Sequence, residues 1–337
     1  MKKVVVVGFG FMGLSHTINI LKNKELQLTA IVDKDQGNIE KKLTEQTGNF
    51  STGNLKPESL SGIKFYSSLD ECLSMEDPDA CFICVHTDLH YEMAKKALLA
   101  GKHVFLEKPV CLDIKQGEEL ITLANERNLI LLVGQVVRFM PAYRKLQQWI
   151  ISGKFGPLRF LSLSRFAGIP AWGEWTEKQS NFGSSGGALF DLVIHDIDFV
   201  QSVLGVPDSI RSEILPGKLS NHDYVSAFWK YNGRDIVVKI EGGLIFHSTF
   251  PFHAGFSALF ERASILYSTF QPDHISISTN QESNQISAGD ANEGFAGEVD
   301  YFTTCMEDGV RPLLCTPESA LLTIRICYDH LNNKGIR

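Results

Sequence analysis

The sequence predicts an α/β protein with a doubly wound parallel sheet in its N-terminal part and an α+β domain with an open, mainly antiparallel sheet in its C-terminal part. Strand and helix patterns alternate through the first 135 residues, whereas strand-like runs follow one another through residues 209–280 without a helix-sized segment between them. At 337 residues the chain is too long for one ordinary core. We therefore expect two domains, residues 1–135 and 136–337.

The strands expected in the first domain are short and apolar on both faces, as buried parallel strands require. They are residues 4–7, 28–32, 64–66, 80–85, 103–106 and 129–133. Capping residues punctuate the helices between them. The expected helix starts are Ser68 with Glu71, Asp88 and Asp113, and Gly101 is expected to end the helix over residues 91–98.

The second domain is expected to mix helices with strands. Helices are predicted over residues 143–151, 188–204 and 317–331, and strands over residues 158–165, 225–231, 235–240 and 265–267. Residues 281–294 are polar and are predicted to form a loop. The final helix starts at a Thr316 cap followed by proline, and it is expected to pack back toward the N-terminal domain.

Composition argues against several classes of protein. The net charge of −7 disfavours nucleic acid or an anionic membrane as the main partner. No apolar run approaches the roughly 20 residues that span a bilayer, and the valines after Lys3 stop at glycines without a signal-peptide cleavage site. The seven cysteines are an odd number, and Cys81 and Cys84 are expected to point to opposite faces of a strand. We therefore expect core cysteines and a reducing, cytoplasmic location.

The sequence Gly8-Phe9-Gly10-Phe11-Met12-Gly13 is G-x-G-x-x-G, and it lies between the first predicted strand and a helix over residues 14–21. Such glycines make the tight turn, admit a pyrophosphate and let the helix pack on the sheet, so that phosphates lie against free N–H groups. Asp33 lies 20 residues after Gly13, where an acid binds the ribose 2′-OH of NAD. Its charge would repel the 2′-phosphate of NADP, although Lys34 could partly rescue NADP binding. The pattern predicts a Rossmann domain that prefers NAD.

Candidate catalytic residues come from two places. Glu107-Lys108-Pro109 follows the strand over residues 103–106, and open α/β sheets bind ligands beyond the carboxyl ends of strands. Asp191 and His195 are four residues apart on a predicted helix and therefore share a face. A carboxylate orients an imidazole and raises its basicity, which suits a general base for an alcohol proton. The same pair could hold an ion, but neither H-E-x-x-H nor a clear third ligand is present, and no metal is predicted.

Together these elements resemble the Gfo/Idh/MocA family (glucose-fructose oxidoreductase, inositol dehydrogenase, rhizopine catabolism), over nearly the whole length. Each element alone is weak, but the combination in this order is highly specific. The resemblance is carried by Gly8–Gly13, Ala100-Gly101-Lys102-His103-Val104 with Glu107-Lys108-Pro109, Arg138-Phe139 with Pro141, Gly186-Gly187-Ala188 with Asp191, His195 and Asp198, and Glu298-Val299-Asp300-Tyr301-Phe302.

The resemblance implies hydride transfer between nicotinamide and a secondary alcohol or carbonyl of a sugar, sugar derivative or cyclic polyol. It implies that Lys108 hydrogen-bonds the reacting oxygen, that His195 takes the hydroxyl proton and that Asp191 orients His195. Glu107 and Pro109 would shape the cofactor pocket. The outer face of the family's C-terminal sheet often builds dimers or tetramers, so a homodimer or homotetramer is implied.

The chain departs from the family pattern in two places. Relatives commonly carry Thr-Pro-Asn where this chain has residues 85–87, so His86 and His90 are expected to contact the cofactor in a different loop. Residues 135–138 lack the common asparagine, which leaves the substrate range open. Candidate substrate contacts are Arg138, Tyr143, Trp172 and Trp175; the tryptophans either stack on a sugar ring or form a lid or interface.

Two other functions remain open beside the dehydrogenase. A regulator that binds NAD and a sugar without turnover would not need the set of Lys108, Asp191 and His195. A redox-neutral enzyme that processes glycosides would hold NAD tightly and release no net NADH. The sequence does not choose between hexose, aminosugar, uronate and inositol, and neither a nucleic acid nor a membrane partner is predicted.

Overall fold

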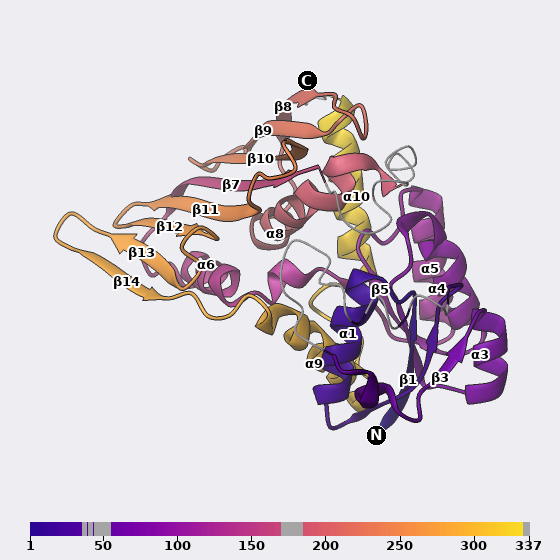
Figure 1. Ribbon diagram of the computed structural model, residues 1–337. Coiled ribbons are helices and arrows are strands. Elements are labelled where there is room, and N and C mark those ends of the chain that lie inside the picture. The colour runs from indigo at the N-terminus through magenta and orange to yellow at the C-terminus, as the bar shows by residue number, and fades with distance from the viewer. Residues whose placement is uncertain (36–38, 40–42, 44–54, 170–184, 333–337) are drawn as a thin grey trace. The chain divides into compact units, whose positions relative to one another are not determined.

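The computed structural model describes residues 1–35, 39, 43, 55–169 and 185–332 (Figure 1). Its residues form two compact units, of which the first combines residues 1–135 with residues 295–321. The second combines residues 136–294 with the C-terminal residues from 322 onward. Residues 295–321, assigned to the second domain from the sequence, thus cluster with the first unit. Each helix in the described part of the chain is too short or too polar to cross a bilayer.

The first unit contains a six-stranded parallel sheet in the order β3-β2-β1-β4-β5-β6 (Figure 1). This order confirms the predicted doubly wound sheet, in which the first crossover runs to one side of β1 and the later ones to the other. The interior strands are apolar on both faces because helices cover the sheet on both sides. The strands are β1 (Lys2–Val7), β2 (Leu26–Val32), β3 (Lys64–Tyr66), β4 (Ala80–Ile83), β5 (His103–Glu107) and β6 (Leu131–Gly134).

The helices of the first unit largely begin where the sequence signals them. The Ser68 hydroxyl accepts the Glu71 N–H at 3.2 Å, and the Asp113 carboxylate caps α5. Asp88 was wrongly predicted as a cap, because its carboxylate bonds the His86 ring while Leu89 precedes the helix. The helices are α1 (Phe11–Lys22), α3 (Leu69–Glu76), α4 (His90–Leu99), α5 (Ile114–Glu126) and α9 (Glu293–Asp308), with 3₁₀ turns η2 (Pro57–Leu60) and η3 (Thr87–Leu89).

The second unit contains an eight-stranded sheet in the order β14-β13-β12-β11-β7-β10-β9-β8 (Figure 1). Within the described part of this sheet, β7 and β10 form the only parallel pair, which confirms the predicted mainly antiparallel sheet. The strands are β7 (Leu158–Gly168), β8 (Ser209–Leu215), β9 (Tyr224–Lys230), β10 (Val237–Phe246), β11 (His253–Phe260), β12 (Ser264–Ser268), β13 (His274–Ser278) and β14 (Ser283–Ser287).

The strand β14 corrects the predicted loop over residues 281–294. Its sequence is polar, but it pairs with β13 along its whole length at the edge of the sheet. An edge strand needs only one partner and can be short and polar, so hydrophobic periodicity does not reveal it. The same predicted loop also hides the first residues of α9.

The helices of the second unit are α6 (Pro141–Ser152), α8 (Ile194–Leu204) and the later part of α10 (Pro317–Asn332), with the 3₁₀ turn η4 (Val136–Arg138). Thr316 caps α10 by accepting the Ser319 N–H at 3.0 Å, as predicted. The helix predicted over residues 188–204 is interrupted: Leu189–Val193 (η6) is π-helical before α8 begins. Such π-turns occur often at functional sites.

Candidate active site

The glycine turn between β1 and α1 has room for a side chain at one glycine and none at the other two. Gly8 has a φ of +91°, and a Cβ there would lie 2.7 Å from the Cys84 carbonyl oxygen. A Cβ on Gly13 would lie 2.0 Å from the Gly8 oxygen. At Gly10, by contrast, an added Cβ would meet nothing within 4 Å. The turn is therefore tight but leaves space at Gly10, directly before α1, a geometry that fits a pyrophosphate.

Asp33 lies beside this turn, directly after β2. One carboxylate oxygen accepts the Phe9 N–H at 2.7 Å, and the other accepts the Asp35 N–H at 2.9 Å. These bonds fix an anionic group next to the glycines, where it can accept further hydrogen bonds from a ribose. Lys34 is exposed, whereas Phe11 and Met12 are half-buried in the first turn of α1.

Lys108 follows β5 and is half-buried, and the Lys108–Pro109 peptide bond is cis. Glu107 does not face outward with it. Its carboxylate is buried, accepts the Lys108 N–H at 3.1 Å and contacts the His16 ring at 2.6 Å. The Glu107 side chain thus points into the interior of the first unit, because the pleat turns adjacent residues to opposite sides. That Glu107 shapes the cofactor pocket stays a prediction.

His90, predicted as a cofactor contact, supports the loops around it, and its contact with the cofactor stays a prediction. It is buried at the start of α4, with Nδ1 2.7 Å from the Pro109 carbonyl oxygen and Nε2 3.0 Å from the Val85 oxygen. Both ring nitrogens thus face main-chain acceptors, and burial lowers the pKa of His90. The ring holds the Pro109 turn against the loop after β4. His86 stays half-exposed and bonds Asp88 at 2.9 Å.

Asp191 and His195 lie in the second unit, on either side of the junction between the π-turn and α8. Both are half-buried. The preceding Gly186 and Gly187 have φ of +85° and +71°, and a Cβ on Gly187 would lie 2.9 Å from the ring of His222. His222 bonds the Gly186 carbonyl oxygen and so fixes the start of this segment.

Arg138 and Tyr143, predicted as substrate contacts, are instead buried in the second unit. Arg138 binds the Asp198 carboxylate through two hydrogen bonds of 2.6 Å. Tyr143 is 1% exposed and packs edge-on against Phe199 and Phe256. The side chains that enclose both residues come from segments far away in the sequence, and a contact of either residue with substrate stays a prediction. Trp172 and Trp175 lie outside the described residues.

Sequence reasoning also missed a buried cluster in the first unit. His16, Glu107 and Glu298 bring their polar atoms together from α1, β5 and α9. The available signal was a histidine three residues after Gly13, in a helix expected to pack on the sheet.

Two family profiles match the chain. One, described as "Oxidoreductase family, NAD-binding Rossmann fold", matches residues 2–135, and the other, "GFO/IDH/MocA C-terminal domain", matches residues 143–250. Together they cover well over half of the chain. The chain belongs to the Gfo/Idh/MocA oxidoreductase family. This confirms the resemblance inferred from the motifs.

Relatives within the family are named as dehydrogenases. The scyllo-inositol 2-dehydrogenase (NAD(+)) of Bacillus subtilis is 25% identical over 326 residues, covering 93% of this chain and 88% of the relative. The D-glucoside 3-dehydrogenase of Escherichia coli is 27% identical over 208 residues, covering 61% and 54%. The chain spans about half the length of the first curated relatives it matches.

Solved structures show the same fold at lower identity. The myo-inositol 2-dehydrogenase from Lactobacillus plantarum superposes with a TM-score of 0.79 at 20% identity, covering 98% of this chain and 96% of the other. The match extends over both units, so the arrangement of strands and helices within each is that of the family.

Proposed function

We propose that this protein is an NAD(H)-dependent dehydrogenase or reductase that acts on a CH–OH group of a sugar, a sugar derivative or a cyclic polyol. The observation that carries the proposal is the glycine turn with Asp33 bonded to the Phe9 N–H beside it. The names of the inositol and glucoside dehydrogenases among its relatives support the substrate class.

The nicotinamide, when bound, supplies the hydride acceptor or donor. We assign the proton chemistry to the half-buried residues of the two units. Lys108 donates a hydrogen bond to the reacting oxygen, and His195 takes the hydroxyl proton as general base. Asp191 orients the imidazole and stabilises its charged form.

NAD is preferred over NADP in this proposal. The Asp33 carboxylate is held by two main-chain N–H groups, so it cannot swing away without leaving both unpaired. It would therefore face a 2′-phosphate with an unfavourable like charge. Exposed Lys34 is the nearby cation that could moderate this preference.

The test is a panel of inositols, hexoses, aminosugars and uronates offered with NAD or NADP, followed at the NADH absorbance band. Steady NADH formation with at least one substrate is expected. Cofactor that survives purification, with product formed but no net NADH, would replace the dehydrogenase with a redox-neutral enzyme. Binding of NAD and sugar without any turnover would identify a regulator instead.

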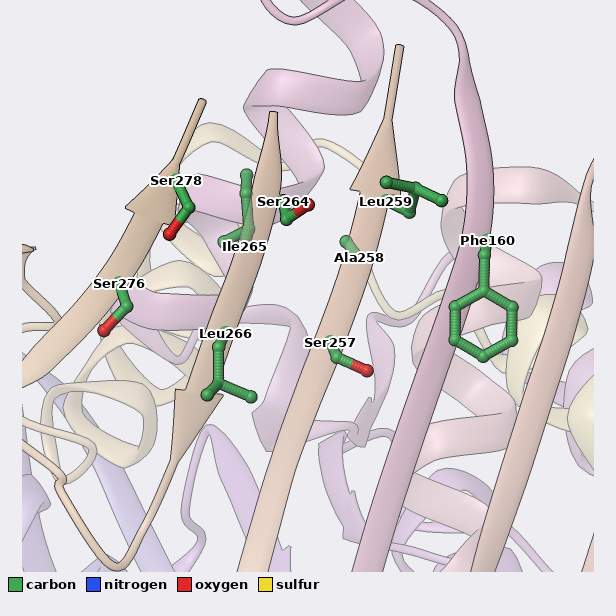
Figure 2. Close-up of a pocket in the computed structure, with 9 residues that line it drawn as sticks. All are labelled: Phe160, Ser257, Ala258, Leu259, Ser264, Ile265, Leu266, Ser276 and Ser278. Atoms are coloured by element: carbon green, nitrogen blue, oxygen red, sulfur yellow. The ribbon is translucent and has the colours of Figure 1, made fainter. Parts of the chain in front are cut away.

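We also propose that a second copy of the chain covers the outer face of the second sheet. A shallow hollow of about 340 Å³ lies there across β7, β11, β12 and β13 (Figure 2). Its residues form two rows across the strands, because Phe160, Leu259, Ser264 and Ser278 are register neighbours, as are Ser257, Leu266 and Ser276. Leu259 and Leu266 are about half exposed, at 47% and 55%. Small serines beside exposed leucines suit close packing against a flat apolar partner surface.

Light scattering tests this assembly. The wild-type protein should be a dimer or tetramer, and Leu266→Glu should reduce its mass. Leu99→Glu, at an equally exposed leucine on α4, should leave the mass unchanged. A wild-type monomer would refute the proposed interface without touching the proposed chemistry.

A further inference from the structure

Three polar side chains meet in the interior of the first unit. The His16 Nε2 atom on α1 lies 2.6 Å from Glu107 Oε1 at the end of β5 and 3.8 Å from Glu298 Oε1 on α9. The side chains of His16 and Glu298 are fully buried, and that of Glu107 is nearly so. The rings of Phe105 and Phe82 pack against His16, at centroid distances of 4.8 and 6.1 Å. Such a cluster is costly to bury, so its retention calls for a role.

The two carboxyl groups differ in their hydrogen bonds. Glu107 accepts from the His16 ring through Oε1 and from the Lys108 N–H through Oε2. Each oxygen of Glu107 therefore has a hydrogen-bond partner. Within the described residues, neither Glu298 oxygen has a hydrogen-bond partner. Burial, together with the nearby Glu107 charge, raises the pKa of Glu298 well above its usual range. The protonated form of Glu298 is therefore favoured in the folded state.

The cluster connects the two parts of the proposed cofactor site. His16 lies on α1, one and a half turns after Gly10, so it fixes the helix whose start forms the glycine turn. Glu107 holds the main chain of Lys108 directly. Gly134 is the neighbour of Glu107 on β6, and a Cβ there would lie 3.4 Å from Glu107 Oε1.

A bound metal ion explains this geometry less well. Two tetrahedral ligand atoms, each about 2.0 Å from a zinc ion, lie about 3.3 Å apart. His16 Nε2 and Glu107 Oε1 are 2.6 Å apart, which is a hydrogen-bond distance. Both atoms would have to move before they could share an ion.

We propose that His16, Glu107 and Glu298 form a positioning cluster that fixes the main chain of Lys108 relative to the start of α1. The proposal rests on the proposed function, because it gives the cluster its purpose through Lys108. Glu107 is the member that touches Lys108, His16 orients Glu107, and Glu298 closes the cluster on the other side of the His16 Nε2 atom, 3.8 Å away.

The raised pKa of Glu298 makes the stability of the cluster depend on pH. The groups that face Glu298 are His16 from α1 and Glu107 from β5, and burial, followed by the two carboxyl groups, raises the pKa of the Cys84 thiol after β4. Because the pKa of Glu298 is raised in the folded state, its contribution to stability is full below the unfolded pKa. It is lost as pH rises through the folded-state pKa.

The first experiment measures melting temperature against pH for the wild-type protein, Glu298→Gln and Glu307→Gln. Gln at position 298 keeps the shape of the protonated acid and cannot ionise, so this variant should lack the part of the stability loss that Glu298 causes as pH rises above the unfolded pKa of a glutamate. Glu307 is exposed on the same helix, and its variant should follow the wild type. A loss of stability with rising pH that is unchanged in Glu298→Gln would overturn the proton assignment. Zinc that stabilises the wild type but not His16→Leu would replace the proposal with a metal site.

The second experiment separates positioning from folding. Glu107→Gln keeps one acceptor oxygen, which cannot serve both His16 and Lys108, so kcat should fall by about 10²-fold while the Kd of NAD, measured by fluorescence, stays constant. His16→Gln retains a side-chain N–H donor for Glu107 and should therefore keep more of kcat than His16→Leu, which has none. Normal kcat in Glu107→Gln, with kcat lost in Lys108→Ala, would overturn the positioning role alone. Normal turnover in Lys108→Ala would instead refute the role assigned to Lys108, and a wild type without turnover on the substrate panel would refute the proposed function. The pH experiment would report on the cluster in either case.

Discussion

Both units bury charged side chains, but they satisfy them differently. In the second unit, the Asp198 carboxylate accepts two hydrogen bonds from Arg138 and one of 2.9 Å from the Thr323 hydroxyl. The Asp196 carboxylate accepts two hydrogen bonds from Arg165, of 3.0 and 2.9 Å. In the first unit, the Glu298 oxygens have no hydrogen-bond partner within the described residues. Complete pairing is what a structural core requires. An incompletely paired carboxyl group beside the strand end that carries Lys108 is better explained by function.

The largest effect is expected from substitutions at the half-buried residues to which we assign the chemistry, Lys108 and His195. Lys108→Ala and His195→Ala should each reduce kcat by about 10²- to 10⁴-fold, because each removes a group that acts on the reacting oxygen or its proton. The Kd of NAD should change little. Turnover assays combined with NAD titration measure both quantities, and normal kcat in both variants would refute the assigned site.

The paired cluster of the second unit should matter for stability. Asp198→Asn leaves the Arg138 charge buried without a counter-ion and should lower the free energy of unfolding by about 3–5 kcal/mol. The exposed pair of Arg159 and Asp235 offers a matched control, and Asp235→Asn should cost less than about 1 kcal/mol. Urea unfolding measures both. Equal stability of the two variants would remove the contrast between the two units.

A third prediction concerns a buried histidine of the second unit, which is fully paired only when neutral. The Trp229 indole N–H donates to His330 Nε2 at 3.0 Å, and His330 Nδ1 donates to the Ile326 oxygen at 2.8 Å. Burial lowers the pKa of His330 to about 4. Its contribution, about 3 kcal/mol, is therefore present above the unfolded pKa of about 6.5 and is lost as pH falls toward 4.

Melting temperatures between neutral and acid pH test this contribution. His330→Gln should be less stable at neutral pH and should lose less stability on acidification than the wild type. His274→Gln, at an exposed histidine on β13, serves as the control. A wild-type acid slope in His330→Gln would show that another group is responsible.

The smallest effect sharpens the cofactor assignment in the first unit. Asp33→Asn keeps an oxygen for the Phe9 N–H but removes the negative charge, so the ratio of kcat/KM for NAD over NADP should fall by about ten- to a hundredfold. Lys34→Ala should leave or increase the preference for NAD. Steady-state kinetics with both cofactors measures the ratio, and an unchanged ratio in Asp33→Asn would contradict the ribose contact.

The parts of the fold that follow local rules could be predicted from the sequence. The parallel strands, the glycine turn and the Ser68 and Asp113 caps depend on residues within a few positions of one another. The partners of Arg138 and Tyr143 could not be predicted, because Asp198 lies 60 residues from Arg138 in the sequence. From the sequence alone, Arg138 could be interpreted as a ligand contact, because its buried counter-ion was not known.

The helix around Asp191 illustrates a second limit. A period of 3.6 predicts that Asp191 and His195 share a face, but the π-turn over Leu189–Val193 changes the angular spacing at that point. No residue type predicts a π-turn, because its wider turn of helix depends on how the surrounding side chains pack. The role of His16 was similarly hidden, because its two acidic partners come from β5 and α9.

All seven cysteines of the chain lie in its described part, and each is a buried, free thiol. Six belong to the first unit, and Cys327 belongs to the second. Modification by a thiol reagent therefore requires the chain to open, and mass spectrometry of the labelled sites would time the opening of each unit separately. The native cysteines thus report the unfolding rate of each unit without any engineered probe.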